Sequence, residues 1–454
     1  MRIDAYDHDM SSHAAVFAFR AAASMLSLGS LLAQEPLSLS QAVGRSLATH
    51  PAVAAGQAAV RAAQQGALEA RAGRWARVDY TESFNRSNNP VFVFSSLLTQ
   101  RQFAASNFAL GPLNRPDFVN NFQSLVMAVQ PLYDGGRARA AMAQAEGGRA
   151  AAEADEQGLR LLLARQTATA YLNAVLAREG VRVAVAALES ATANLKTAEN
   201  IRDAGRSTEL DVLAVKVHRA AMAEQLIRRE SEQRQAQAAL NEAMGVSLSE
   251  SHRLTSVLTS SGVATAAPRP DRPEQHAAAA QLRQAEAQRL AARAAMLPQV
   301  SAQGAFEADR QRFVNRGGAN WLAGVTLKWT PFQAGADRAR VRAATERIAG
   351  VKANQRALDS RIALEVMQGG EAVQSAQARV AASSAAVEMA AESLRITKNR
   401  YEAGLATVTE LLRAETAQAE ASLRLLAAQH DVRVSEVALE AARGTLTADS
   451  PVLQ

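Results

Sequence analysis

The sequence contains no cysteine and few aromatic side chains, which make up 4% of its 454 residues. Without cysteine, the chain has no disulfides, no thiolate metal sites and no N-terminal cysteine for a lipid anchor. Its 48% apolar content comes largely from alanine, leucine and valine. This composition favours thin, closely packed helices over a broad globular core.

Long hydrophobic runs are also missing. No stretch approaches the run of about 18 apolar residues that a membrane-spanning helix needs, so a membrane span would have to consist of strands. The apolar run at residues 21–33 is too short for a span and has the length of a signal-peptide core. We therefore predict a signal peptide at 1–33 and a mature chain starting near Gln34. An amphipathic N-terminal helix is the alternative.

Neither sign of charge dominates the sequence. The chain has 50 basic and 44 acidic residues, with a formal net charge of +6, and the two signs are interspersed. This pattern is typical of solvated coiled-coil flanks and disfavours nucleic acid as a partner. The seven histidines show no metal-ligand spacing, and no nucleophile motif or phosphate loop occurs. The sequence therefore predicts no enzyme activity, no metal site and no cofactor.

What the chain does contain is an internal repeat. Residues 201–213 read IRDAGRSTELDVL and residues 400–412 read RYEAGLATVTELL, at an offset of 199 that places Gly205 on Gly404. The same offset aligns LYDGGRAR with PFQAGADR further upstream. The sequence therefore predicts a tandem duplication, with a first repeat at 34–245, a linker at 246–272, a second repeat at 273–443 and a C-terminal tail at 444–454.

Each repeat is predicted to contain a helix, a β-hairpin and one long helical hairpin. No proline occurs from Arg137 to Arg202, and a helix over this stretch would measure roughly 100 Å. The turns of the helical hairpins are expected at 203–209 and 402–408, with Ser207 or Thr208 capping the helix after the first turn. Heptad-spaced apolar residues indicate antiparallel coiled coils.

The β-hairpins are predicted at 75–133 and 298–332. In the second, apolar and polar residues alternate along both strands, as in a sheet with two different faces. Trp321 and Trp329 lie on the apolar face about 26 Å apart, close to the height of a transmembrane apolar band. With Trp75 of the first hairpin, they are candidate membrane-girdle aromatics. A water-soluble hairpin, the alternative, would show the same alternation.

Four strands cannot close a barrel, which needs about eight strands before its interior holds side chains. An open sheet in lipid would leave unpaired edges there. The membrane interpretation therefore requires oligomerisation, although these arguments leave the number of subunits open. The first hairpin also carries an insertion at 89–118, which we interpret as an elaborated external loop.

Three motifs carry a family resemblance: QPLYDGGR at 130–137, MLPQV at 296–300 and RYEAGLATVTELLRAE at 400–415. Together with the tandem repeat, in this order and spacing, they resemble the TolC-like outer-membrane efflux proteins over essentially the whole mature chain. The resemblance implies a mainly α fold with a β membrane portion. Long antiparallel coiled-coil hairpins would form an α-barrel tunnel, and each chain would give four strands to a trimeric, twelve-stranded transmembrane β-barrel.

The resemblance also implies a function and partners. The chain would be a passive exit duct in the outer membrane of a Gram-negative bacterium, extending into the periplasm, for tripartite efflux or type I secretion. Its partners would be two further copies in a homotrimer, outer-membrane lipid, a periplasmic adaptor protein and an inner-membrane pump of the RND or ABC type. A soluble coiled-coil scaffold or adaptor protein is the alternative, but it has no use for girdle tryptophans or a signal peptide. The sequence names no substrate.

Carried over to matching positions, the resemblance places adaptor-docking tips at the two glycine turns: Ala204, Gly205, Arg206, Ser207, Thr208, Ala403, Gly404, Leu405, Ala406 and Thr407. It places a gate at Tyr401, Asp211, Glu410 and Arg413, and Tyr401 is expected to donate a hydrogen bond to Asp211. Some members carry arginine at the position of Ala406 and a second acid at the position of Arg413. Strong cation selectivity at this aperture is therefore not expected.

Overall fold

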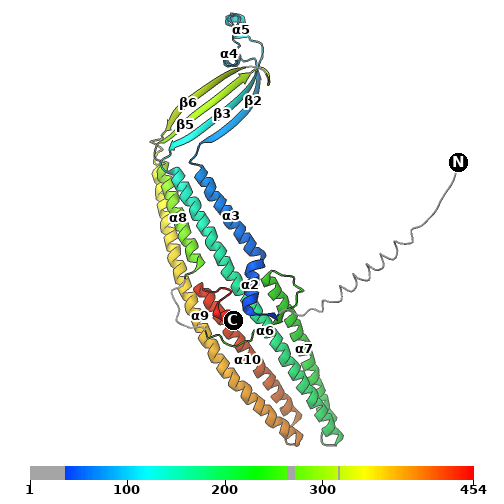
Figure 1. The fold of residues 1–454 in the computed structure, drawn as a ribbon. Helices are drawn as coiled ribbons and strands as arrows, with labels where there is room; N and C mark the ends of the chain where they lie inside the picture. The colour runs from blue at the N-terminus through cyan, green and yellow to red at the C-terminus, as the bar shows by residue number, and fades with distance from the viewer. Residues whose placement is uncertain (1–35, 263–270, 315–316) are drawn as a thin grey trace, which may run out of the picture.

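A computed structural model of the chain describes residues 36–262, 271–314 and 317–454. The predicted signal peptide at 1–33 lies outside these ranges. A long helical body makes up most of the described chain, and a four-stranded sheet lies at one end of it (Figure 1).

Two helices run most of the length of this body: α6, Arg137–Asp203, and α9, Ala336–Glu402. Each folds back into a shorter helix, α6 into α7 (Glu209–Met244) and α9 into α10 (Val408–Arg443). The two hairpins contact one another through α6 and α10 (Figure 1). This arrangement confirms the predicted helical hairpins. No helix in the described ranges has both the length and the apolarity to cross a membrane.

Shorter helices lie between the sheet and the middle of the body (Figure 1). They are α2 (Leu39–Thr49), α3 (Pro51–Ala72) and α8 (Pro273–Ala294). Small residues allow close contact, because a Cβ added to Gly147 of α6 would lie 2.7 Å from the Cγ of Gln284 on α8. The close helix packing that the alanine-rich composition predicts is therefore present.

The sheet is antiparallel, in the order β2-β3-β5-β6. Its strands are β2 (Arg77–Ser87), β3 (Val119–Tyr133), β5 (Gln299–Arg310) and β6 (Gly318–Lys328). β3 of the first repeat pairs with β5 of the second, so both repeats build one sheet. Within the described chain, the outer edges of β2 and β6 pair with no other strand.

The two faces of the sheet differ in polarity, as the alternation predicts. One row of register partners runs through Tyr80, Val126, Phe306 and Trp321 across all four strands, and Trp321 is 80% exposed. We call this side the apolar face and the opposite side the polar face. Trp75 and Trp329 lie just outside the strands, not within them.

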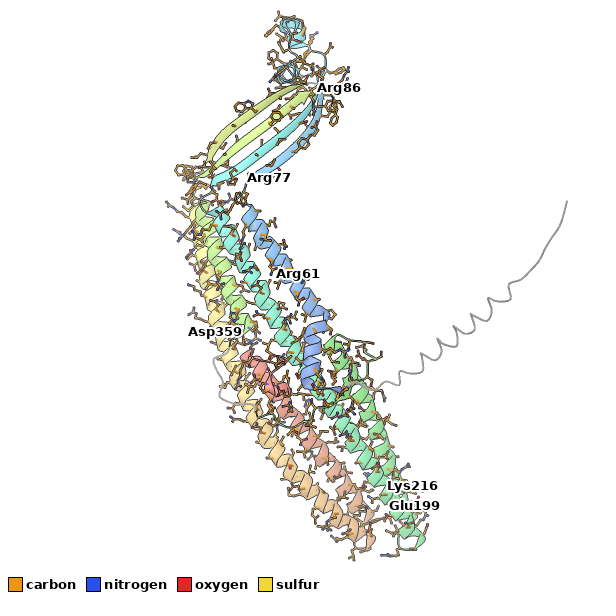
Figure 2. All side chains as sticks on the ribbon, in the orientation of Figure 1. Arg61, Arg77, Arg86, Glu199, Lys216 and Asp359 are labelled. Carbon is orange, nitrogen blue, oxygen red and sulfur yellow. The ribbon has the colours of Figure 1, made fainter. Side chains whose placement is uncertain are left out.

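Charged side chains occur along the helices, such as Arg61 and Asp359, and at both ends of β2, where Arg77 and Arg86 lie (Figure 2). Near the glycine turns, the Nζ of Lys216 on α7 lies 3.8 Å from the Oε1 of Glu199 on α6. The guanidinium carbon of Arg86, at the far end of β2, lies 3.5 Å from the ring centroid of Phe118. Exposed ion pairs contribute at most about 1 kcal/mol each, so packing of the apolar seams determines the fold.

The insertion between β2 and β3 is folded and not extended. It contains α4 (Pro90–Thr99), the 3-10 turn η1 (Ala105–Phe108) and α5 (Leu110–Asn114). Edge-to-face ring contacts hold these pieces together, with centroid distances of 4.6 Å for Phe94–Phe103 and 5.0 Å for Phe103–Phe108. The residues that follow α4 dock onto the sheet.

The principal apolar core lies halfway along the helical body, where α2, α6, α7 and α10 meet. Two segments predicted to be a linker and a tail contribute to it. β4 (Arg253–Leu254) pairs in parallel with β1 (Pro36–Leu37), and Leu453 of the short turn η2 (Pro451–Leu453) is fully buried. The prediction of a linker at 246–272 is therefore incomplete, because the described part of that segment also contributes to the core.

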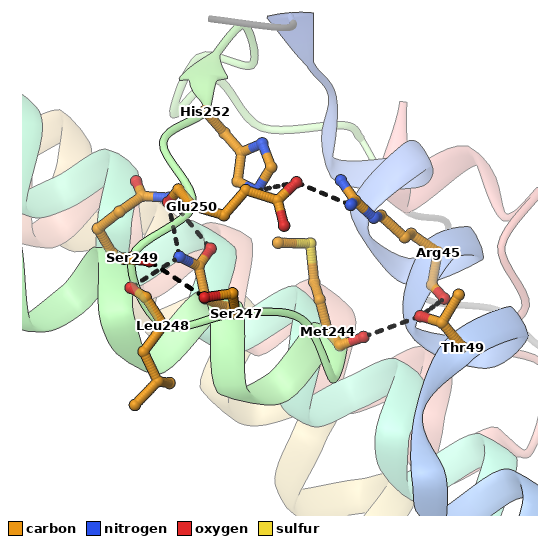
Figure 3. A network of polar contacts seen from close by, with 10 residues as sticks. Arg45, Thr49, Met244, Ser247, Leu248, Ser249, Glu250 and His252 are labelled. Atoms are coloured by element: carbon orange, nitrogen blue, oxygen red, sulfur yellow. Dashed lines mark hydrogen bonds and ion pairs between the residues drawn. The ribbon is translucent and has the colours of Figure 1, made fainter. Parts of the chain in front are cut away.

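Buried polar groups tie these segments to the helices. The Tyr171 hydroxyl of α6 donates to the Leu37 carbonyl at 2.7 Å and accepts from the amides of Thr255 and Ser256. Figure 3 shows a second network, in which Arg45 of α2 pairs with Glu250 at 2.7 Å, next to His252. Because each buried donor needs an acceptor, these contacts fix the path of the chain between the repeats.

Candidate functional site

The two glycine turns have the same backbone geometry. Gly205 and Gly404 adopt left-handed φ angles of +73° and +78°. In the first turn, the amide of Arg206 donates to the carbonyl of Ile201 at 3.0 Å, and in the second the amide of Leu405 donates to that of Arg400 at 2.7 Å. Both are Schellman turns, which require a residue that tolerates positive φ. The two turns of the sequence repeat thus have equivalent backbone hydrogen bonds.

The helix that follows each turn begins with a capping box. Thr208 caps α7, and its amide and hydroxyl donate to the Oδ2 of Asp211 at 3.1 Å and 2.8 Å. Thr407 caps α10 in the same way, donating to the Oε2 of Glu410 at 2.7 Å and 3.1 Å. Two residues predicted to be gate acids are therefore equivalent capping residues of the repeat.

These bonds change the acidity of both carboxyl groups. The hydrogen bond from the Thr208 side chain is the main cause that lowers the pKa of Asp211, and Ser207 also contributes. The backbone hydrogen bond from Thr407 lowers the pKa of Glu410, and the nearby charges of Arg400 and Arg413 lower it further. Both carboxyl groups are therefore ionised at neutral pH.

The predicted hydrogen bond from Tyr401 to Asp211 is wrong for this structure. The Tyr401 hydroxyl is buried and has no hydrogen-bond partner in the described part of the chain. It lies close enough that the Asp211 charge, after burial, raises the Tyr401 pKa. The capping box accounts for the difference, because Asp211 turns an oxygen back to the start of its own helix and not across to α9.

Tyr401 instead belongs to a small apolar core at the tips. Its ring packs with side chains from three other helices: Ala198, Val212, Val215, Val408 and Leu411. This core joins the two hairpins close to their turns. Tyr401 therefore acts as an aromatic in the seam between the hairpins, and its packing fixes the relative position of the tips.

The remaining predicted tip and aperture residues are mostly on the surface. Glu410 and Arg413 are exposed on α10, and Leu405 is 70% exposed at the second turn. The Nη2 of Arg206 reaches across to the second turn, only 3.2 Å from where a Cβ on Gly404 would lie. The two predicted docking turns are thus in contact with one another.

Sequence reasoning missed a polar cluster further along the hairpins. Glu415 of α10 is 6% exposed and accepts a hydrogen bond from Ser190 of α6 at 2.6 Å and another from Asn194. The Nε2 of His218 on α7 lies 3.3 Å from its other oxygen. The sequence does hold a signal, because Glu415 follows Val408 and Leu411 at heptad core spacing. One carboxylate therefore links both hairpins.

Sequence comparison identifies the family of this molecule. A model of outer membrane efflux proteins matches residues 42–246 and 269–445. The chain belongs to the outer membrane efflux protein family. This family consists of transport channels and not enzymes, and membership places the chain in the outer membrane with an extension into the periplasm. No curated protein sequence matches the chain.

Solved outer-membrane channels share the fold of this efflux-family chain. CusC is 19% identical with a TM-score of 0.77, covering 89% of this chain and 92% of that chain. VceC of Vibrio cholerae is 21% identical with a TM-score of 0.72, covering 89% and 96%. The open state of the Neisseria gonorrhoeae channel MtrE is 18% identical with a TM-score of 0.71, covering 90% and 91%.

Proposed function

We propose that this efflux-family protein is, as a homotrimer, the exit duct of a tripartite export system. It would conduct substrates passively from a periplasmic adaptor and an inner-membrane pump across the periplasm and the outer membrane. The observation that carries the proposal is the contrast between the two ends of the molecule. One end exposes an apolar sheet face with open edges, and the other exposes two equivalent glycine turns.

The open edges of the sheet support the trimer. In lipid, the unpaired backbone groups of β2 and β6 would each cost several kcal/mol, and pairing β6 of one copy with β2 of the next removes that cost. Three copies of four strands would close a twelve-stranded barrel, well above the minimum of about eight strands. Trp321 and its apolar neighbours would then face lipid, and the polar face would line the lumen.

The alternative, a soluble coiled-coil scaffold, conflicts with the same face. Phe306, Trp321 and Val325 are 52%, 80% and 69% exposed, and they share one face of paired strands. A contiguous apolar patch of this kind marks a membrane or partner contact. The geometry therefore favours a duct over a scaffold, and leaves both efflux and type I secretion open.

The glycine turns are the proposed adaptor-docking surface, and Glu410 and Arg413 the proposed aperture lining. Photo-cross-linking tests the docking surface directly. A photoreactive residue at Leu405, an exposed tip position, should form an adduct with an adaptor protein in cells. The same residue at Val257, 65% exposed and halfway along the body, is the control and should form none. The absence of an adduct from position 405 would contradict docking at the tips.

A further inference from the structure

The polar face of the sheet carries an acidic pair, with one member buried and the other partly buried, near the end that is remote from the helical body. Asp309 and Glu307 both lie on β5, two residues apart on the same face. Asp309 is fully buried. β5 and its partner β3 are the central strands, so neighbouring copies joined at the sheet edges would not contribute to this place.

Amide side chains surround the pair. The Nδ2 of Asn121 on β3 donates to the Oδ1 of Asp309 at 2.6 Å, and the Nε2 of Gln123 donates to the Oε1 of Glu307 at 2.8 Å. The two carboxyl groups lie close enough to interact electrostatically. In the described part of the chain, the Oδ2 of Asp309 has no hydrogen-bond partner. The pair thus retains an oxygen with no donor.

A second buried group reaches this place from the external insertion. Gln100, directly after α4, is 1% exposed. Its Nε2 donates to the carbonyl of Asn120 at 2.9 Å and to the Oδ1 of Asn121 at 2.8 Å. Both partners accept, so the amide orientation is fixed and Oε1 faces away from them. Among the described residues, that oxygen also has no partner.

The docking of the insertion holds Gln100 in this position. The Nη2 of Arg101 donates to the carbonyl of Ala319 on β6 at 2.9 Å. On the other side of Gln100, Thr99 lies so close to Gly318 that a Cβ on Gly318 would overlap the Thr99 carbonyl oxygen. Gln100 is therefore held between two contacts with β6.

No basic side chain neutralises the pair within the described ranges. Arg310 is the next residue along β5, but it lies on the apolar face and pairs with Glu82 at 3.2 Å. Two like charges this close together, with one of them buried, are costly unless a cation or a proton compensates them. The free acceptors are all oxygens, which is the ligand chemistry of hard divalent cations.

We propose that Asp309, Glu307 and Gln100 form a calcium-type divalent cation site that pins the external insertion to the sheet. Asn121 is a positioning residue, because it orients both Asp309 and Gln100. Among the described residues, no three acidic, histidine or cysteine side chains are placed to hold a metal ion together. The proposed site therefore has two carboxylates and one amide as protein ligands, and water would complete the coordination. Calcium tolerates such a mixed and irregular shell better than magnesium does. With few charged ligands, the affinity is expected in the range of extracellular modules, about 0.1–1 mM.

The test uses the full mature oligomer in detergent, stripped with a chelator and then titrated with CaCl2. Thermal unfolding and calorimetry should show binding of one Ca²⁺ per chain, with a higher melting temperature. Asp309→Asn should weaken binding by about tenfold or more, and Gln100→Leu should weaken it in the same direction. Gln100→Leu is the second variant, which still tests the site where Asp309→Asn fails to fold. Asp79→Asn is the control, because Asp79 lies on the same sheet but pairs with Arg77 at 2.9 Å.

Two results would overturn the site. The native protein could show no response to CaCl2 after chelation, in which case the carboxyl pair shares a proton. A response could also persist unchanged in Asp309→Asn and Gln100→Leu, which would place the bound calcium elsewhere, for example on copurified lipid. Neither outcome bears on export, because the site and its assay concern cation binding and not conduction.

Discussion

The Tyr401 hydroxyl lies near the Asp211 carboxylate and donates no hydrogen bond to it. A buried hydroxyl without a partner destabilises a fold, so its removal is tolerated. We predict that Tyr401→Phe leaves the melting temperature and conductance of the channel unchanged or raises the melting temperature slightly. Tyr401→Ala should instead open the tip core and lower stability by about 3 kcal/mol or more. A loss of stability in Tyr401→Phe as large as in Tyr401→Ala would show that the hydroxyl is bonded.

Substitution of either tip glycine should block export without disrupting the oligomer. A residue with a β-branched side chain at φ near +75° is strained by roughly 1–2 kcal/mol, and at Gly404 its Cβ would also meet Arg206. We expect Gly205→Val and Gly404→Val to abolish the export that the native gene restores to a deletion strain, while outer-membrane levels stay normal. Gly370→Ala is the control, because this helical glycine has open space around it. Full export by Gly404→Val would remove the case for docking at this turn.

The capping boxes predict a pH dependence of the tips. The pKa values of Asp211 and Glu410 are lowered in the folded protein from usual values of 3.8 and 4.5. The stabilisation they provide is therefore fully present above those usual values and is lost as the pH falls through the lowered ones. Amides of residues 204–211 and 403–410 should lose protection from hydrogen exchange on acidification below about pH 4.

The matched variants for this prediction are Thr208→Ala and Thr407→Ala. Each should cost about 1 kcal/mol of local helix stability and should reduce the acid-dependent step at its own turn. The reduction should be larger in Thr208→Ala, because the backbone amide of Thr407 still donates to Glu410 in Thr407→Ala. A step of unchanged size in both variants would assign the acid sensitivity to other carboxyl groups.

Glu415 should be the acid whose loss most weakens the contact between the hairpins. Glu415→Ala leaves Asn194 and Ser190 with unmatched buried groups, and we expect a loss of about 1–3 kcal/mol in thermal unfolding. Glu415→Gln can still accept from both and should lose less. Glu420→Ala removes an exposed ion pair with Arg424 on the same helix and should change stability by less than about 0.5 kcal/mol. Equal losses at positions 415 and 420 would contradict this role.

Much of the fold could be predicted from the sequence because its signals are periodic and duplicated. The offset that places Gly205 on Gly404 fixes both turns, and the alternation around Trp321 identifies the apolar face. These features depend on local spacing. The starts of α7 and α10 follow from Thr208 and Thr407, since a capping box is defined by four consecutive residues.

What could not be predicted depends on which side chains meet across the chain. Asp211 has two candidate partners, Tyr401 and Thr208, and only the backbone geometry at the turn decides for Thr208. The packing of Leu254 and Leu453 into the central core joins segments with little periodicity of their own. Gln100 and Asp309 meet because the external insertion folds back onto the sheet, which no sequence pattern indicates.

The central claim, that three copies form an outer-membrane duct, is tested most directly by the mass of the purified particle. Mass photometry of the mature protein, extracted with detergent from isolated outer membranes, should give three chains per particle after subtraction of the detergent. Edge substitutions that block strand pairing, such as Val325→Pro in β6, should abolish this species. Recovery of the native protein as a monomer from the soluble fraction would contradict the account.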